Sequence, residues 1–565
     1  MSMRPRVLAE IPEQTAAVAR AAFREPALAM RVRDELGEVF ADGAFIDAFG
    51  IRGRPGISPG QLAMVTVLQF AENLTDRQAA DAVRGRIDWK YCLGLDLIDS
   101  GFDFSVLSQF RTRLVTHDLQ GMAFEILLDR LVERGLVTAR GRQRTDATHV
   151  VAAVRDLNRL EMVGETLRAA LEALAAAAPQ WLASHVDAAM VKRYGARIDE
   201  WRLPKDQAGR RKLAVQTGRD GYRLLKAVTG RQAPHWLGEV PAVDVLRQVW
   251  IQQYTVAESG RAVIWRDAER YGLPPGRTRI ISPYDIDARY SEKRGTSWDG
   301  YKVHVTETCD NTPAGDGTTD PARPPNLITN VVTTHAAVAD SAMTMNIHTM
   351  LADRDLLPAE HLMDAGYPST ASLLALRTEH QVRLVGPMRG DSSRHAREGS
   401  PYARDKFTID FDRQQVTCPQ GHRSATWNPG RQDGQDVIVV SFPLGACIIC
   451  PARTDCTRSQ QRRRQLTLRP RHLHEALRDA RAEQQTDDWK HTYRARAGIE
   501  GTIHQVTAVT GIRQARYTGL GKVSLEHAFA ATAVNLIRLY AWWTGTPLQR
   551  TRTTHLSRLE LTLAA

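Results

Sequence analysis

Long hydrophobic runs are absent from this sequence. No stretch approaches the ~18 consecutive apolar residues that a membrane-spanning helix needs, so we predict no membrane association. The N-terminal stretch "MSMRPRVLAEIPEQTAAVAR" also lacks the apolar segment and cleavage site of a secretion signal. The cytoplasm is therefore the expected compartment.

Cysteine is scarce, with 6 in 565 residues, which excludes a disulfide framework. The chain has no internal repeat and no low-complexity tract beyond "LEALAAAA", which argues against a repeat architecture. What remains is a composition typical of globular proteins, 43% hydrophobic and 25% charged, over a length that predicts about three or four domains. The formal charge of +11 fits a nucleic-acid partner without requiring one.

The N-terminal region carries strong signals for short helices. Ser58 precedes a proline and an apolar run, and Thr75 precedes "DRQAADAVRG", so each residue is placed to cap a helix. Two capped helices joined by a tight turn resemble a helix-turn-helix, and a third helix follows with Arg111 and Arg113. Two interpretations stay open: these arginines contact DNA, or the bundle is a small helical domain with a solvated basic face.

Beyond residue 140 the pattern changes to an α/β order. "RTDATHV" predicts a strand with Asp146 near its middle, and a long helical region with an apolar stripe follows to about 275. Strand patterns then alternate with helices, and Asp364 ends one strand in "LMDAGY". A cysteine-bearing segment interrupts this order before a helical C-terminus.

The stretch "HTYRARAGIEGTIHQV" places Tyr493, Arg496 and Glu500 at helical spacing on one face. Gly498 costs a helix about 1 kcal/mol relative to alanine, so we infer that its backbone is approached closely. An Arg–Glu pair four residues apart is also common as a purely structural feature of helices.

Asp146, Asp364 and Glu500 are the candidate metal ligands. Carboxylates are preferred by Mg²⁺, and two such ions about 3.5–4 Å apart activate a water or hydroxyl for phosphoryl transfer. Taken singly, each aspartate at a strand end is more typical of a turn or cap.

Together these motifs resemble bacterial insertion-sequence transposases of the DDE class that carry a Y-x2-R-x3-E-x6-K signature. "RTDATHV" and "DAGYPS" resemble the strands holding the first two aspartates of that class, and residues 282–308 and 511–539 resemble its flanking segments. The resemblance implies an RNase H-like mixed sheet whose first three strands are antiparallel. It also implies two Mg²⁺ or Mn²⁺ ions bound by Asp146, Asp364 and Glu500.

The implied organisation has three parts. Residues 1–135 form a helical DNA-binding domain, and residues 140–545 form the catalytic domain. The catalytic domain contains a helical insertion at about 155–275 and a cysteine insertion at about 405–465. Residues 546–565 form a tail.

The signature's lysine falls on Thr507 in this sequence. His504, Arg513 or Arg516 are the candidates to supply the missing cation, and the sequence does not choose among them. Arg496 and Tyr493 are expected to contact DNA phosphates.

Four cysteines cluster in "CPQGH" and "CIICPARTDC": Cys418, Cys447, Cys450 and Cys456. A CxxC pair with two further thiolates predicts a structural Zn²⁺ site, with His422 as a substitute ligand and free thiols as the alternative.

The expected function is cleavage of DNA at element ends and strand transfer into target DNA, by a homodimer associated with the nucleoid when bound to DNA. A catalytically inactive DNA-binding or regulatory relative and a metal-dependent nuclease without joining activity are the alternatives.

Overall fold

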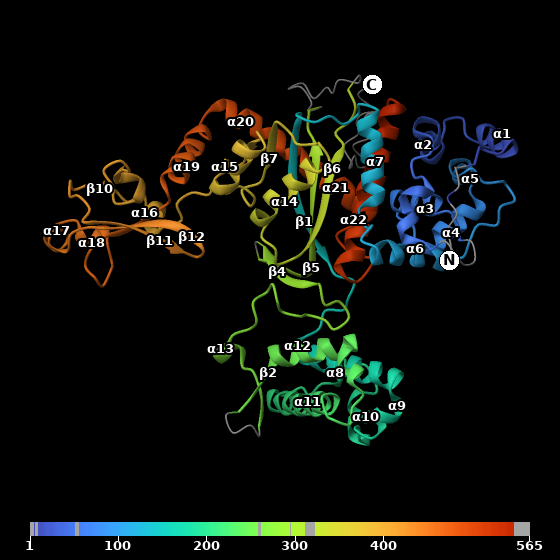
Figure 1. Cartoon of the computed structure of the whole chain (residues 1–565), viewed down its shortest axis with the longest axis horizontal. Helices are drawn as coiled ribbons and strands as arrows, with labels where there is room; N and C mark the ends of the chain where they lie inside the picture. The colour runs from blue at the N-terminus through green and yellow to red at the C-terminus, as the bar shows by residue number, and fades with distance from the viewer. Residues whose placement is uncertain are drawn as a thin grey trace, which may run out of the picture.

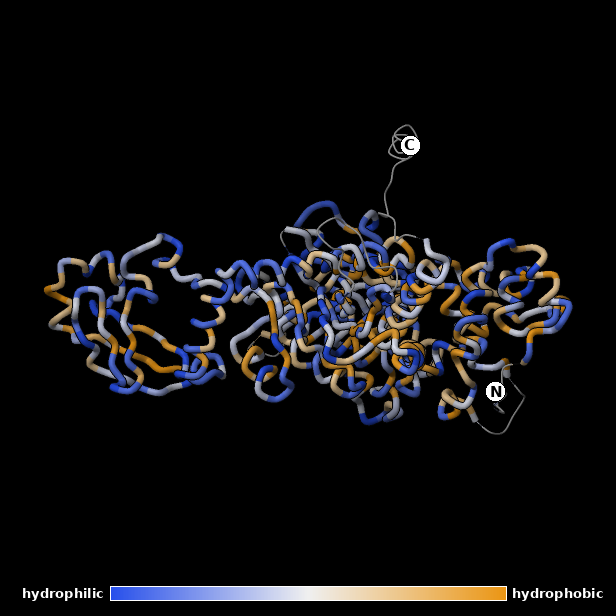
Figure 2. The backbone as a smooth tube through the Cα atoms, turned by 90° about the horizontal axis from the view of Figure 1, so that it is seen from above, coloured by the Kyte–Doolittle hydropathy of each residue, from blue (hydrophilic) through white to orange (hydrophobic). Residues whose placement is uncertain are grey.

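The computed structural model describes residues 5, 9–50, 56–257, 262–293, 295–310 and 323–546, so the predicted tail lies almost wholly outside the described residues. A central body built on a mixed sheet carries a helical bundle at one end and the cysteine-bearing segment at the other (Figures 1 and 2). A separate group of helices, α8 to α12, projects from the body in Figure 1. Among the described helices, none combines the length and apolarity needed to cross a membrane.

The central sheet has six strands in the order β4-β5-β1-β7-β8, with β6 also paired to β5. Antiparallel pairing joins β1 to β5 and β5 to β6, whereas β7 and β8 run parallel to β1. The antiparallel start and the mixed character agree with the sequence-based prediction. The strands are β1 (Arg142–Val151), β4 (Arg289–Lys293), β5 (Thr296–Thr308), β6 (Ile328–His335), β7 (Glu360–Met363) and β8 (Arg383–Val385).

Helices that lie between the strands in the sequence, or follow them, cover this sheet. α14 (Asp340–Ala352) and α22 (Leu520–Trp543) pack on β6, and α21 (Gly498–Thr510) packs on β1. α15 (Thr370–Glu379) lies against β8. Because the sheet is covered, β5 reads as a nearly continuous buried run and not as a polar–apolar alternation.

The N-terminal bundle shares its hydrophobic core with the sheet body. α3 is almost wholly buried, and its Phe70 stacks on Phe529 of α22 with ring centroids 6.3 Å apart. The predicted caps are present: the Ser58 hydroxyl accepts from the Gln61 amide at 3.1 Å, and Thr75 forms a reciprocal capping box with Gln78. Its helices are α1 (Glu13–Ala22), α2 (Leu28–Leu36), α3 (Pro59–Ala71), α4 (Asp76–Gly85), α5 (Ile87–Leu93), α6 (Ser105–Thr116) and α7 (Met122–Glu133).

The helical insertion has a hydrophobic core of its own. The predicted stripe from Leu160 to Leu174 lies on α8 and faces this core, as expected for an amphipathic helix. Its main helices are α8 (Arg159–Ala177), α9 (Pro179–Ala183), α10 (Ala188–Tyr194), α11 (Gln207–Val228) and α12 (Pro241–Gln253). A short hairpin, β2 (Tyr254–Val256) with β3 (Val263–Trp265), and α13 (Ala268–Tyr271) follow.

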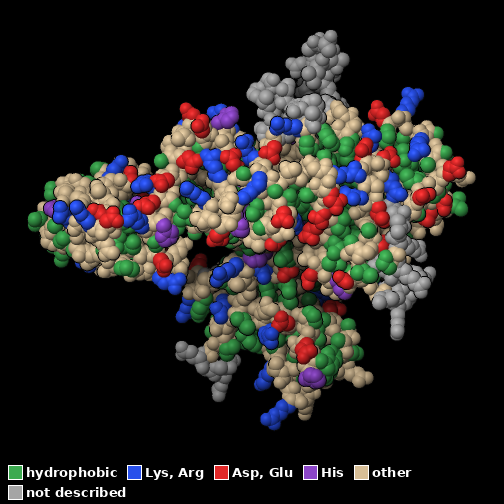
Figure 3. All heavy atoms as spheres, turned by 45° about the horizontal axis from the view of Figure 1, so that its top comes forward, with side chains coloured by type: hydrophobic (Ala, Val, Ile, Leu, Met, Phe, Trp, Pro, Cys, Tyr) green, Lys and Arg blue, Asp and Glu red, His purple; other side chains and the backbone are tan. Residues whose placement is uncertain are grey.

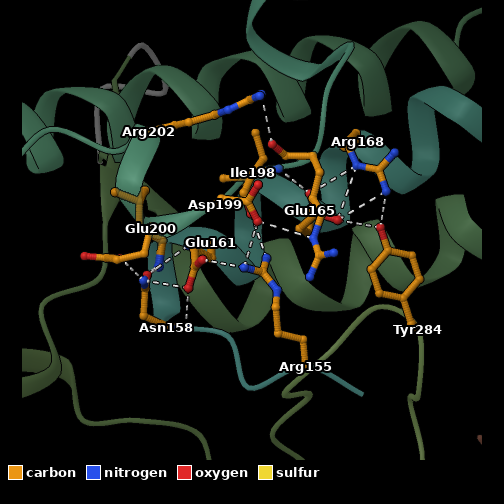
Figure 4. A network of polar contacts seen from close by, with 12 residues as sticks. Arg155, Asn158, Glu161, Glu165, Arg168, Ile198, Asp199, Glu200, Arg202 and Tyr284 are labelled. Carbon is orange, nitrogen blue, oxygen red and sulfur yellow. Dashed lines mark hydrogen bonds and ion pairs between the residues drawn. The ribbon is translucent and has the colours of Figure 1, made fainter. Parts of the chain in front are cut away.

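A polar network fixes the base of this insertion to the chain that returns to the sheet (Figure 4). The buried Glu165 carboxylate accepts from the Tyr284 hydroxyl at 2.6 Å and from the Ile198 amide at 2.6 Å. Arg155, just beyond β1, contacts Glu161 at 2.9 Å and Asp199 at 3.1 Å. Both sides of the connection are therefore held by charged hydrogen bonds.

The cysteine insertion folds around a third small core. Its strands are β9 (Thr408–Asp410), β10 (Gln415–Thr417), β11 (Thr426–Gln432), β12 (Gln435–Ser441) and β13 (Gln465–Leu468), with helices α17 (Leu444–Ile449) and α18 (Arg453–Cys456). α19 (Arg471–Glu483) and α20 (Asp487–Arg494) lead back to the sheet body.

Candidate active site

Three carboxylates from distant parts of the chain line one cavity of about 350 Å³. Asp146 lies within β1, Asp364 directly follows β7, and Glu500 lies in the first turn of α21. β1 and β7 are parallel neighbours with Thr145 opposite Met363. The residues that follow on the two strands, Asp146 and Asp364, therefore lie at the same end of the pair. The structure thus brings together the three predicted acids.

The two aspartates are oriented in the same way. One oxygen of Asp146 accepts from the Ala147 amide at 2.7 Å, and one oxygen of Asp364 accepts from the Ala365 amide at 2.7 Å. Each carboxylate is therefore held by the backbone of the following residue, which restricts its side-chain rotation.

Arg496 bridges two of the acids. Its Nη2 lies 2.5 Å from Asp146 Oδ2, and its Nη1 lies 3.0 Å from Glu500 Oε1. The Arg496 and Asp146 side chains are each 14% exposed, whereas Glu500 is 67% exposed. Burial raises the pKa of Asp146, and the charge of nearby Asp364 adds to that rise, while Arg496 opposes it.

The signature does not lie on one continuous α-helix, which corrects the sequence-based interpretation. α20 ends at Arg494, a 3₁₀ turn covers Ala495–Ala497, and α21 begins at Gly498. The 3₁₀ turn carries Arg496, so this side chain leaves the backbone at a break between two helices.

Another side chain approaches the Gly498 backbone closely, as we expected from a glycine placed in a helix. A Cβ atom at this position would lie 2.0 Å from Nη1 of Arg144 on β1. Arg144 donates to the Ala495 carbonyl at 2.6 Å and to Glu307 at 2.7 Å. Because Gly498 has no side chain, the buried Arg144 guanidinium fits beneath the break between α20 and α21.

Glu307 on β5 is the centre of a buried ionic network that the sequence analysis did not identify. Its other oxygen accepts from Arg538 of α22 at 2.7 Å and from the Thr502 hydroxyl at 2.6 Å. Burial raises the pKa of this carboxyl, but Arg538 and Arg144 outweigh burial and leave the pKa below its usual value. The network joins β1, β5, α21 and α22 behind the cavity. A signal was present, because charged residues interrupt β-branched strand patterns in "RTDATHV" and "VHVTET".

Tyr493 does not line the cavity. Its ring stacks on Trp489 with centroids 4.8 Å apart and packs against the small cluster that contains Leu362 and Val385. Burial raises the pKa of its hydroxyl, Arg496 opposes the rise, and the charges of the three acids add to it, so the hydroxyl lies within electrostatic reach of the site. The structure therefore gives Tyr493 a packing position beside β7 and β8.

The three candidates for the missing cation lie in two different places. His504 and Arg513 line the cavity together with Thr507, whose hydroxyl donates back to the Ile503 carbonyl at 2.7 Å. The Arg516 side chain instead contacts the bundle, where it donates to the Leu74 carbonyl at 3.0 Å and lies over the Phe70 ring. Arg516 therefore joins the body to the bundle.

The two arginines of the bundle occupy different environments. Arg111 is buried, is paired with Asp76 at 2.5 Å and lies over the Tyr517 ring. Arg113 is partly exposed and lies over the Phe49 ring. The Arg111 guanidinium is thus engaged by contacts within the chain, whereas Arg113 remains the proposed DNA contact of the bundle.

Charge on the visible surface is mixed. On the face in Figure 3, basic and acidic side chains are interspersed across the bundle, the body and the cysteine insertion. The net charge of +11 is therefore not gathered into one patch on this face.

The chemistry of the three acids fits a divalent cation, since Mg²⁺ and Mn²⁺ prefer carboxylate oxygens. In their present positions, however, no three or more His, Cys, Asp or Glu side chains of the described residues form a group able to hold a metal ion. At the acids, the Arg496 guanidinium supplies the positive charge between Asp146 and Glu500.

The same finding applies to the cysteine insertion. The four predicted thiols line one small cavity of about 30 Å³ together with His422, and none forms a disulfide. Their convergence agrees with the predicted grouping, but zinc binding stays a prediction because the thiols do not form a metal-holding group as placed.

Two segments of the chain are similar to known transposase domains. Residues 417–540 match a family model described as "Transposase DDE domain", and residues 29–113 match one described as "Transposase domain (DUF772)". The first match contains Arg496 and Glu500 but begins after Asp146 and Asp364. The chain therefore contains segments similar to two transposase domains, one of them a DDE domain. No curated protein and no solved structure matches it.

Proposed function

We propose that this protein is a transposase that cleaves DNA at the ends of its element and uses the freed 3′ hydroxyl to attack target DNA. We propose that an RNase H-like catalytic domain performs both steps. The observation that carries the proposal is the meeting of Asp146, Asp364 and Glu500 in one cavity, from three elements distant in sequence. The strand order and directions of the sheet support it. The two transposase-domain matches support it independently.

The three acids are the proposed ligands of two Mg²⁺ or Mn²⁺ ions. Such a pair, when bound, activates a water or a 3′ hydroxyl and stabilises the leaving oxygen of the phosphodiester. The chain contributes positioning: backbone amides orient both aspartates, and the buried network around Glu307 fixes β1 against α21.

Arg496 is the proposed contact to a DNA phosphate beside the acids. Its guanidinium now pairs with Asp146 and Glu500, and a forked permanent cation suits a phosphate equally well. His504 and Arg513 line the same cavity and add polar contacts for the DNA backbone.

The proposed organisation follows the sequence-based division. Residues 1–135 bind DNA, and residues 140–545 form the catalytic domain with its two insertions. Two DNA ends must be handled together, so we propose a homodimer in the DNA complex.

Cleavage of an end duplex tests the function. In Mg²⁺ or Mn²⁺, we expect Asp146→Ala, Asp364→Ala and Glu500→Ala each to lower strand cleavage by about 1,000-fold or more, because each removes a ligand worth several kcal/mol in the transition state. Binding of the duplex should remain. Asp488→Ala, at an exposed acid on α20, is the matched control and should cleave normally.

The products on a denaturing gel discriminate the alternatives. Cut and joined strands support a transposase, whereas cut strands without joined products favour a nuclease. Binding without any cleavage favours a regulatory relative. Cleavage that survives all three single substitutions would show that the acids are not the catalytic site.

A further inference from the structure

The carboxylate cavity has a basic residue, Lys293, that lies outside the Y-x2-R-x3-E-x6-K signature. Lys293, the last residue of β4, lines this cavity together with the three acids and Arg513. Its side chain is exposed, and within the described part of the chain it forms no ion pair or hydrogen bond. Arg496, by contrast, is engaged by Asp146 and Glu500.

A curled hairpin carries Lys293 to this place. In β5 the Trp298 indole donates to the Tyr301 carbonyl at 3.1 Å. Gly300 permits β5 to press against β1, because a Cβ atom there would lie 2.2 Å from the Val150 carbonyl oxygen. The Trp298 ring then lies beside His149 of β1, with centroids 5.5 Å apart.

Trp298 is 9% exposed and belongs to the core. The contacts of Trp298 and Gly300 therefore hold the base of the β4–β5 hairpin against β1, and Lys293 near its other end lies at the cavity. The electrostatics agree with this placement: burial lowers the pKa of His149, and the charges of Arg513 and Lys293 lower it further.

The cavity lacks the cation that the signature places at residue 507. Thr507 faces the cavity, but its hydroxyl is donated to the backbone of its own helix. Arg516 is committed to the bundle. Lys293 and Arg513 are the remaining permanent cations among the residues that line the cavity, apart from Arg496.

We propose that Lys293 binds a backbone phosphate of the DNA held in the carboxylate cavity and, with Arg513, replaces the cation missing at Thr507. The inference rests on the proposed function, because it assigns the partner of the same site. A lysine acts here as a flexible point charge, so it tolerates a phosphate whose position is set by the other contacts.

The test measures binding of the full chain to a fluorescently labelled duplex of the element end over a range of salt. Loss of one phosphate contact should reduce the slope of log affinity against log salt by about 0.9. We expect this reduction for Lys293→Ala and a restored slope for Lys293→Arg. Lys226→Ala, at an exposed lysine of α11 outside the cavity, is the matched control and should leave the slope unchanged.

Neutral methylphosphonates placed one at a time along the duplex locate the contact. With the native chain, one neutralised phosphate should weaken binding, and with Lys293→Ala the same change should have no further effect. A slope for Lys293→Ala equal to that of the native chain, or a phosphate effect that persists in the variant, overturns the inference.

Cleavage of the same duplex by the native chain separates the two proposals. If the native chain cleaves but Lys293→Ala keeps the native salt slope, the inference fails and the proposed function stands. If the native chain does not cleave but the slope falls as expected, the phosphate contact stands and the proposed chemistry fails.

Discussion

At Gly498 the guanidinium of Arg144 fills the space that a side chain would take. Arg144 is 7% exposed and is bonded to Glu307, which is fully buried. A buried ion pair of this kind is costly to break, because removing one partner leaves an uncompensated charge. The glycine therefore protects the network that fixes β1 against the segment carrying Arg496 and Glu500.

Gly498→Ala should destabilise the fold by roughly 2–4 kcal/mol, because the new methyl group displaces a buried and fully bonded guanidinium. Urea unfolding measures the change. Gly501→Ala on the same helix is the control: nothing lies within 4 Å of a Cβ there, so we expect no loss and a gain of up to about 1 kcal/mol. Equal stabilities for the two variants would contradict this account of Gly498.

At the scale of the element, the break between α20 and α21 decides how the signature residues are used. A continuous helix would place Tyr493, Arg496 and Glu500 on one face. With the 3₁₀ turn at Ala495–Ala497 between them, the Tyr493 ring packs beside β7 and β8, whereas Arg496 and Glu500 line the cavity. The Tyr493 hydroxyl still lies close enough to interact with the charges of Arg496 and the acids. The spacing thus places the Tyr493 ring in a packed cluster and the Arg496 and Glu500 side chains at the cavity.

The cysteine insertion is a second element with its own core, and it yields a separate prediction. If its four thiolates bind Zn²⁺, the purified chain contains about one zinc per molecule, and chelation loosens residues 415–460 because metal binding contributes folding energy. Metal analysis and limited proteolysis measure both effects.

Cys418→Ser should lose the metal, whereas Cys92→Ser, at a buried cysteine of the bundle, should retain it. A metal-free chain that resists proteolysis as well as the untreated protein would remove the zinc hypothesis.

At the scale of the whole molecule, α22 is the element that unites the parts. It packs on β6 of the sheet and on α3 and α7 of the bundle. Glu526 is fully buried in this helix and accepts from the Arg516 amide at 2.9 Å. Burial raises the pKa of Glu526 to about 7, with the Arg516 amide and the charges of Arg516 and Arg111 opposing the rise.

This raised pKa makes stability depend on pH. Between the ordinary glutamate pKa of about 4.5 and the folded value of about 7, the folded state keeps a proton that the unfolded state has released. Stability therefore falls as pH rises through this window.

We expect the difference in unfolding free energy between Glu526→Gln and the native chain to grow in favour of the variant from pH 5 to 8, by up to roughly 3 kcal/mol. Urea unfolding of both chains at each pH measures it, and other titrating groups cancel in the difference. A difference independent of pH would show that Glu526 ionises normally.

The sequence by itself determined the local elements and predicted which three acids meet. Helix caps at Ser58 and Thr75, the apolar stripe of α8 and the strand around Asp146 depend on nearest neighbours along the chain, so periodicity and capping patterns predict them. The spacing of Arg496 and Glu500 likewise follows from the chain alone.

Only the tertiary structure decided which side chains meet. The buried position of Arg111, the packing of Tyr493, the turning of Arg516 toward the bundle and the approach of Lys293 all depend on contacts between distant segments. Local patterns carry no information on such contacts, because they arise from the pairing of strands that are distant in sequence and from the core that the bundle and the sheet share.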